Sequence, residues 1–237
     1  MTTRTILDFD LGSRVFMVST SSNEAQCLFD LGLNWCFGFN QEEGLACFKA
    51  AAALDPTCAM LHWGIAYAAG PFYNMPWCDF SEVEAAECTA FCRDHLDQAL
   101  ALSDSATALE AALIHALAQR IQKPWPVSQL EYDSWDNAYA NAMRKVNSDF
   151  ADHQDVMALF VEAMMTRTPW NLWDVKKGRP TKDADTLEAI KVCERAIALA
   201  DQFGETPHPA ILHLHIHLLE MSPEPEQAMN SADRLDG

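Results

Sequence analysis

Near its N-terminus the chain spaces large and small residues in a way that few folds accommodate. These positions are Leu28, Leu31, Gly32, Trp35, Gly44, Phe48, Ala51 and Pro56. Glycines such as Gly32 and Gly44 let two helices approach closely, and Phe48 fills the gap between them. The spacing therefore predicts two antiparallel helices, near residues 23–37 and 41–53.

This pattern resembles the tetratricopeptide repeat (TPR), a unit of about 34 residues that folds as two antiparallel helices. The resemblance implies an all-α fold, a TPR-like right-handed α-solenoid of antiparallel helix pairs with roughly ten or more helices. We expect a single domain over residues 1–237, with residues 1–20 as an N-terminal extension. The last repeat, at residues 209–237, lacks the capping helix that usually closes a solenoid.

The remaining helices follow from periodicity and from their end signals. They are expected at residues 58–69, 82–102, 105–122, 131–146, 155–166, 184–202, 209–222 and 225–235. Ser81 and Glu84 form a capping box for the helix that follows an irregular insert at residues 72–80. A polar loop is expected at residues 176–182, and no segment has the pattern of a strand.

Several segments together resemble a family of larger TPR-containing proteins from bacteria and fungi. They lie at residues 38–40, 54–60, 63–67, 70–74, 168–174 and 213–223. The resemblance implies a protein about twice this length, with a further histidine-rich segment beyond residue 237. Gln41 stands where the resemblance implies His, so a metal site that used that His would be incomplete in this chain.

Composition argues against several classes of binding partner, against membrane insertion and against export. The net charge is −18, so neither nucleic acid nor an anionic membrane surface is an expected partner. No apolar run approaches the roughly 18 residues of a membrane span. Residues 1–18 lack the basic end and apolar stretch of a signal peptide, so we expect a cytoplasmic protein. The eight cysteines occur singly, without a CxxC pair, and are expected to be small buried hydrophobes.

The stretch from His208 to Pro223 is the strongest functional signal. Pro209 suits the first position of a helix. At about 100° per residue, His213, His217 and Glu220 fall within an arc of roughly 60° on one face of that helix. His215 points to the opposite side, where we expect packing or a supporting contact.

Three interpretations of this face remain open. His213, His217 and Glu220 could bind one divalent metal ion such as zinc, iron or copper. The same three residues could act without a metal as a catalytic acid–base group, with Glu220 fixing the tautomer of one imidazole. They could also simply satisfy one another between packed helices.

Two aromatic segments are expected to form a ligand pocket around this face. The candidate ligand-binding residues are Tyr73, Asn74, Trp77, Trp170, Asn171, Trp173 and Asp174. Long irregular segments inside helical repeats are often functional. We therefore expect an apolar or aromatic small molecule as the ligand, and acid–base or metal-assisted hydrolysis, isomerisation or cyclisation of the kind found in specialised metabolism.

The alternative function is a TPR interaction scaffold without catalysis. TPR arrays bind peptides or partner proteins, and the uncapped last repeat favours a second copy or a partner chain that covers residues 225–235. An enzyme should enclose the histidine face with the two aromatic segments, whereas a scaffold should leave an open groove.

Overall fold

The computed structural model describes residues 11–235, and ten α-helices lie within that range. Contacts divide the chain into two compact units, the first at Met1–Pro71 and Phe80–Val127, the second at Phe72–Asp79 and Ser128–Gly237. Helices that follow one another in the chain pack together within each unit, which confirms the all-α prediction. Residues 1–10 of the expected N-terminal extension, and 236–237 of the last repeat, lie outside the described part. The expectations of a solenoid and of a single domain stay predictions.

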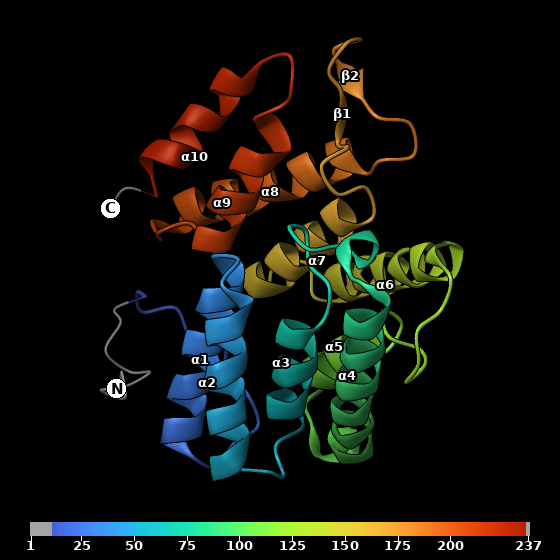
Figure 1. Cartoon of the computed structure of the whole chain (residues 1–237). Coiled ribbons are helices and arrows are strands. Elements are labelled where there is room, and N and C mark those ends of the chain that lie inside the picture. The colour runs from blue at the N-terminus through green and yellow to red at the C-terminus, as the bar shows by residue number, and fades with distance from the viewer. Residues whose placement is uncertain (1–10, 236–237) are drawn as a thin grey trace, which may run out of the picture. The chain divides into compact units, whose positions relative to one another are not determined.

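Five of these α-helices belong to the first unit (Figure 1). They are α1 (Asn23–Phe37), α2 (Gln41–Leu54), α3 (Ala59–Ala69), α4 (Glu82–Leu102) and α5 (Ala108–Leu117). The predicted bounds of the first three helices are confirmed to within one residue. At the start of α4 both hydrogen bonds of the predicted Ser81–Glu84 capping box are present.

Close packing of α1 against α2 takes the form that the residue spacing predicts. A Cβ placed on Gly44 would lie 2.5 Å from Cys36 Sγ and 2.9 Å from the Gly32 carbonyl oxygen. A Cβ on Gly32 would lie 2.9 Å from Phe48, whose ring is fully buried. The two helices therefore approach at a distance that only glycine permits at these positions.

Helix α5 is shorter than predicted. A short 3-10 helix at Ser103–Ser105 precedes it, and Thr107 with Glu110 forms a second capping box, so the α-helix starts at Ala108. It ends at Leu117, where hydrogen bonds between residues three apart replace the α-helical pattern. The capping box fixes the start of α5 because its two side chains accept hydrogen bonds from backbone N–H groups of the first turn, which have no partner within the helix.

Two imidazoles meet between α3 and α4. Nδ1 of buried His62 lies 3.3 Å from Nδ1 of His95, and His62 Nε2 donates to the Pro56 carbonyl oxygen at 3.0 Å. Only one proton fits between the facing nitrogens. Burial lowers the pKa of His95 from 6.5, and the neighbouring His62 and Lys49 lower it further, whereas Asp94 opposes them.

This pair predicts a loss of stability in mild acid. The unfolded chain binds a proton at His95 more readily than the folded chain, so the free energy of unfolding should fall as the pH drops from about 7 to about 5. The slope due to His95 should stay below about 1.4 kcal/mol per pH unit, the value for one whole proton. Urea unfolding of His95→Gln at each pH should show a shallower slope than that of the native protein.

The control for this measurement is His115→Gln, because His115 is an exposed histidine near the end of α5. It should leave the slope unchanged. Buried His215 in the second unit also has a lowered pKa and contributes a slope of the same sign, so His95→Gln should reduce the dependence without abolishing it. Equal slopes for His95→Gln and the native protein would contradict the prediction.

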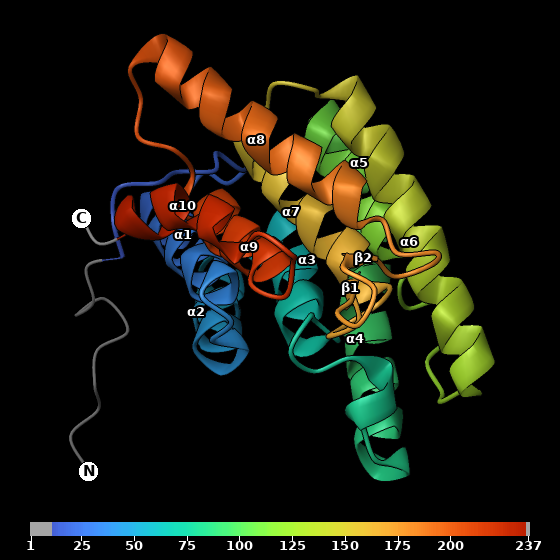
Figure 2. The same cartoon turned by 90° about the horizontal axis from the view of Figure 1, so that it is seen from above.

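The second unit holds the other five α-helices and a short hairpin. The helices are α6 (Gln129–Asp149), α7 (Gln154–Thr166), α8 (Thr186–Phe203), α9 (Pro209–Leu219) and α10 (Met229–Asp233). Figure 2 shows α6, α7 and α8 side by side, and α9 packs on α7, α8 and α10. Phe72–Asp79 of the insert also belong to this unit. The Trp77 ring of the 3-10 helix there (Trp77–Asp79) stacks on Tyr132 of α6 at 4.2 Å between centroids.

Two predictions for this unit are wrong. Strands β1 (Trp173–Asp174) and β2 (Arg179–Pro180) pair antiparallel where a loop without strands was expected. Each strand has only two residues, too few for an alternating pattern to show. The expected helix at residues 225–235 is instead a 3-10 helix at Pro225–Ala228 followed by α10, which has five residues.

All eight cysteines are free, and six of them are buried, whereas Cys27 and Cys78 are exposed. The expectation of small buried hydrophobes therefore holds for six of the eight. Over residues 11–235, no helix combines the length and the apolar character that crossing a bilayer requires.

Candidate functional site

Helix α9 presents one apolar side and one histidine side. Pro209 occupies its first turn, and leucines such as Leu212, Leu214 and Leu218 are buried on the packed side. His213 and His217 are only partly buried. The buried leucines therefore pack α9 against its neighbours, and the two imidazoles lie near the surface of the second unit.

His213, His217 and Glu220 form a hydrogen-bonded row, as their spacing predicts. His217 Nδ1 lies 2.8 Å from Glu220 Oε1, and His217 Nε2 lies 3.1 Å from His213 Nε2. Because a carboxylate only accepts, Nδ1 of His217 carries its proton and donates to Glu220. Nε2 of a neutral His217 is then an acceptor, and His213 Nε2–H donates to it. Glu220 thereby fixes the tautomers of both imidazoles.

One aromatic ring lies beside this row, and a second packs on the first. The Tyr73 ring is 5.9 Å from the His217 ring and 5.2 Å from the Trp170 ring, between centroids. Burial raises the pKa of Tyr73 to about 12; a backbone hydrogen bond from Trp170 opposes this, and the Glu220 carboxylate adds to it. Tyr73 therefore stays a neutral phenol. The two aromatic segments and the histidine helix therefore meet at Tyr73.

Exposure differs along this group of side chains. Tyr73 is buried, the side chain of His217 is 20% exposed, and that of Glu220 is 38% exposed. Trp170 has a positive φ of 59° and is half exposed. Trp170 and Glu220 are therefore the members of this group that are most open to solvent.

The other two candidate residues of the insert, Asn74 and Trp77, have surroundings that differ from those of Tyr73. Asn74 is exposed in a tight turn closed by paired hydrogen bonds between Phe72 and Met75. Trp77 is buried among Tyr132 and Trp135 of α6. In this structure Trp77 packs in the core of the second unit.

Asn171, Trp173 and Asp174 belong to the hairpin segment. They help to line an open hollow of about 850 Å³, formed by residues 171, 173–177 and 179–182. Trp173 Nε1 donates to the Leu218 carbonyl oxygen at 2.7 Å, directly after His217 in α9. The hollow and the histidine row are therefore neighbours, although His213, His217 and Glu220 do not line the hollow.

His215 lies on the packed side of α9, as expected. Its Nδ1 is 2.8 Å from Ser231 Oγ, and burial lowers its pKa, with the Glu194 charge opposing. Within the described residues its buried Nε2 has no hydrogen-bond partner. Its hydrogen bond joins α9 to α10.

The metal interpretation stays a prediction. Two imidazole nitrogens 3.1 Å apart have the spacing of neighbouring ligands on one ion with bonds of about 2.0–2.1 Å. Glu220, however, is hydrogen-bonded to the opposite nitrogen of His217, so in this arrangement it orients an imidazole. Residues 11–235 hold no cluster of three or more His, Cys, Asp or Glu side chains arranged for a metal ion. Gln41, where the resemblance implied His, opens α2 in the first unit.

One pair of residues that positions the site was not predicted from the sequence. His208 is fully buried; its Nδ1 accepts from the Ala210 N–H at 3.1 Å, and its Nε2 donates to Asp155 Oδ1 at 2.9 Å. His208 thus caps α9 and fastens it to the start of α7. Its position before Pro209 was the available signal, but Asp155 lies 53 residues away in sequence.

The chain was compared with protein-family models, curated proteins and solved structures, and none of them matches it. What the site does therefore has to be inferred from its own residues.

Proposed function

We propose that the protein binds an apolar or aromatic small molecule beside Tyr73 and Trp170 and moves protons on it through His213, His217 and Glu220. One observation carries the proposal: three separate segments meet at Tyr73, whose ring lies against the hydrogen-bonded Glu–His–His row on one side and against Trp170 on the other. The half-exposed Trp170 ring, which packs on buried Tyr73, gives a ligand apolar contact area, and an imidazole can both give and take a proton near neutral pH.

The row suits an isomerisation in which a proton leaves one ligand atom and another arrives elsewhere. With one proton in excess, His213 is an imidazolium that donates to the lone pair of His217. A ligand that replaces the hydrogen bond between the two Nε2 atoms loses a proton to His217 Nε2 and gains one from His213 Nε2. His217 is then the imidazolium, stabilised by the Glu220 carboxylate, and His213 is neutral.

The 3.1 Å contact between the two Nε2 atoms resets the pair. When the product leaves, His217 returns its extra proton to His213, and both imidazoles regain their starting charges. No proton is consumed over the cycle. This self-resetting geometry favours a proton-shift isomerisation, such as keto–enol interconversion, over the other chemistries that the sequence left open.

The test is the conversion of enol to keto phenylpyruvate, an aromatic probe followed by loss of the enol absorbance. His217→Gln should slow the enzymatic rate by about 100-fold or more, the usual contribution of general acid–base catalysis. His213→Gln should have a similar effect, because either change removes one of the two proton carriers. Trp170→Ala should chiefly weaken binding of the probe.

His115→Gln is the matched control, because it changes an exposed histidine of the first unit and should keep the full rate. Circular dichroism should show native helix content for each variant. A native protein that does not accelerate the reaction above buffer, or a His217→Gln variant with the native rate, would overturn the proposal.

A TPR-like scaffold is the second candidate. The sequential helix pairs favour it, and so do Met229 and Leu235 near the end of the described chain, which are 58% and 39% exposed. A partner chain or a second copy would cover these side chains in a right-handed solenoid of this type. A scaffold predicts no probe turnover, so the same assay separates the two candidates.

A further inference from the structure

We infer that the ligand of the histidine row carries an anionic group, and that Lys176 and Arg179 of the 171–182 hairpin bind this group. The inference rests on the proposed function, because it names the class of molecule on which that site would act. It follows from the charge, shape and position of the hairpin.

The hairpin concentrates positive charge in an acidic chain. The chain has 16 lysines and arginines against 34 acidic residues. Four of these basic residues fall within residues 176–182, a stretch without any acid. They are Lys176, Lys177, Arg179 and Lys182, and all four line the open hollow of about 850 Å³. This volume lies within the usual range of sites for small molecules.

Two of these cations are available to an external anion. Lys177 Nζ is 2.7 Å from Asp174 Oδ2, and Lys182 Nζ is 3.9 Å from Asp183 Oδ2. Lys176 and Arg179 form no ion pair in the described part of the chain. The hydrogen bond and charge of Lys177, with a smaller effect of the Arg179 charge, lower the pKa of Asp174, so this carboxylate stays ionised. It supplies one negative charge against the four positive charges of residues 176–182.

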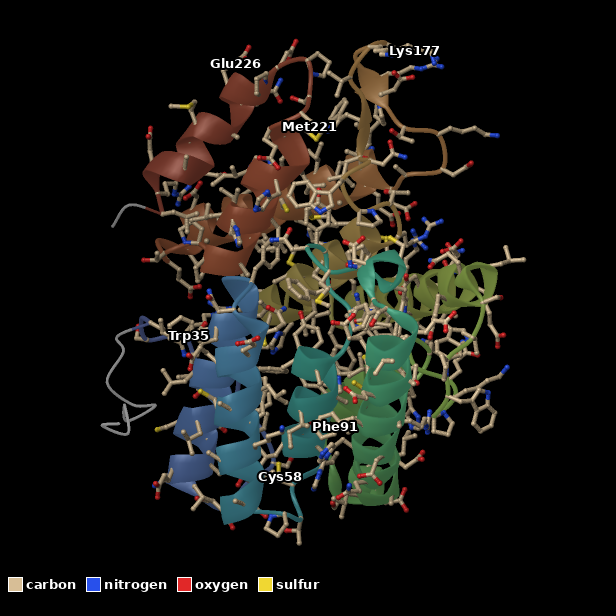
Figure 3. All side chains as sticks on the ribbon, in the orientation of Figure 1. Trp35, Cys58, Phe91, Lys177, Met221 and Glu226 are labelled. Carbon is tan, nitrogen blue, oxygen red and sulfur yellow. The ribbon has the colours of Figure 1, made fainter. Side chains whose placement is uncertain are left out.

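The hairpin is fixed against the end of α9 that carries the histidine row. Trp173 Nε1 donates to the carbonyl oxygen of Leu218, the residue after His217. At the hairpin turn, a Cβ placed on Gly178 would lie 3.4 Å from Pro223 Cγ, three residues beyond Glu220. Figure 3 shows Lys177 on the hairpin and Met221 in the turn after α9, both in this unit. Trp170 directly precedes the hairpin segment.

These observations together describe an elongated ligand. Its apolar or aromatic part would lie at Tyr73 and Trp170, its reacting atoms at His217, and its anionic group in the hollow. An arginine can bind a carboxylate or phosphate through two parallel hydrogen bonds, with a lysine beside it as a point charge. A small anion also fits the overall charge, since the acidic surface repels large acidic partners.

The experiment compares phenylpyruvate with its methyl ester, which keeps the aromatic skeleton but lacks the negative charge. Calorimetric titration of the native protein should show at least about tenfold tighter binding of the acid, equivalent to about 1.4 kcal/mol. In Lys176→Gln/Arg179→Gln the affinity for the acid should fall about tenfold or more, whereas the affinity for the ester should not change. The double variant should keep the native thermal midpoint.

The matched control is Lys191→Gln/Arg195→Gln, which removes two positive charges from α8 in the same unit. Lys191 is exposed, and Arg195 forms a surface ion pair with Asp152. Both probes should bind this control as they bind the native protein. If the two double variants lost the same affinity for the acid, the loss would be a general effect of charge, and the inference would be overturned.

The other outcomes separate this inference from the proposed function. Equal affinity of the native protein for acid and ester would overturn the anion site, even if the acid were isomerised. A charge preference that depends on Lys176 and Arg179, without turnover of the acid, would support the anion site while the proposed isomerisation failed.

Discussion

Replacing His208 by alanine should lower the free energy of unfolding by about 4 kcal/mol. The change removes the hydrogen bond to Asp155, whose side chain is 3% exposed, and it removes the acceptor for the Ala210 N–H. Leaving a buried carboxylate without this partner costs about 3 kcal/mol, and losing a helix N-cap costs about 1 kcal/mol. Urea unfolding followed by circular dichroism measures the sum.

His208→Asn separates the two contributions. Asparagine can still cap α9 through its side-chain oxygen, but it is too short to keep the contact with Asp155 as well, so it should recover about 1 kcal/mol. His115→Ala, an exposed control on α5, should stay within about 0.5 kcal/mol of the native protein. If His208→Ala behaved like that control, the Asp155 contact would not fasten α9 as described.

Gly44→Ala is expected to destabilise the protein by about 2 kcal/mol, although alanine is the better helix former. The new Cβ would meet Cys36 Sγ at 2.5 Å and the Gly32 carbonyl oxygen at 2.9 Å, so α1 and α2 must separate. Overpacking of this kind costs about 1–3 kcal/mol, and the gain in helix propensity of about 1 kcal/mol offsets part of it. Thermal and urea unfolding both report the net change.

Two controls divide this prediction into its parts. Ala53→Gly, at an exposed position of α2, measures helix propensity without a steric contribution and should cost about 1 kcal/mol. Relative to Cys36→Ala alone, the double variant Cys36→Ala/Gly44→Ala should still be destabilised, because the Gly32 carbonyl remains close. If Gly44→Ala were more stable than the native protein, α1 and α2 would have enough space between them for the added methyl group, and the prediction would be wrong.

Much of the helical architecture could be predicted because its signals are local. Ser81 with Glu84 marks the start of α4, and the glycine, phenylalanine and proline spacing marks the α1–α2 pair. The common face of His213, His217 and Glu220 follows from the helical period alone. Caps and periodicity depend on residues within about four positions of one another, and these are visible in sequence.

The predictions that failed depended on weak or competing local signals. The β1–β2 hairpin pairs only Trp173 with Pro180 and Asp174 with Arg179. The last segment begins with two prolines, Pro223 and Pro225, and divides into a 3-10 turn and a short α-helix. The Trp77 ring stacks on Tyr132 in the core, a contact that its place near Tyr73 in sequence does not indicate, and its role in ligand binding stays a prediction.

The sequence by itself determined the helix pairs and the histidine face, since both follow from the geometry of a single helix or of two neighbouring ones. Only the tertiary structure decided that Tyr73 lies between His217 and Trp170, that Asp155 binds His208, and that a basic hairpin adjoins the end of α9. These contacts join residues far apart in the chain. Which of these contacts form depends on how the side chains of all helices in a unit pack together, and a short sequence pattern does not contain this information.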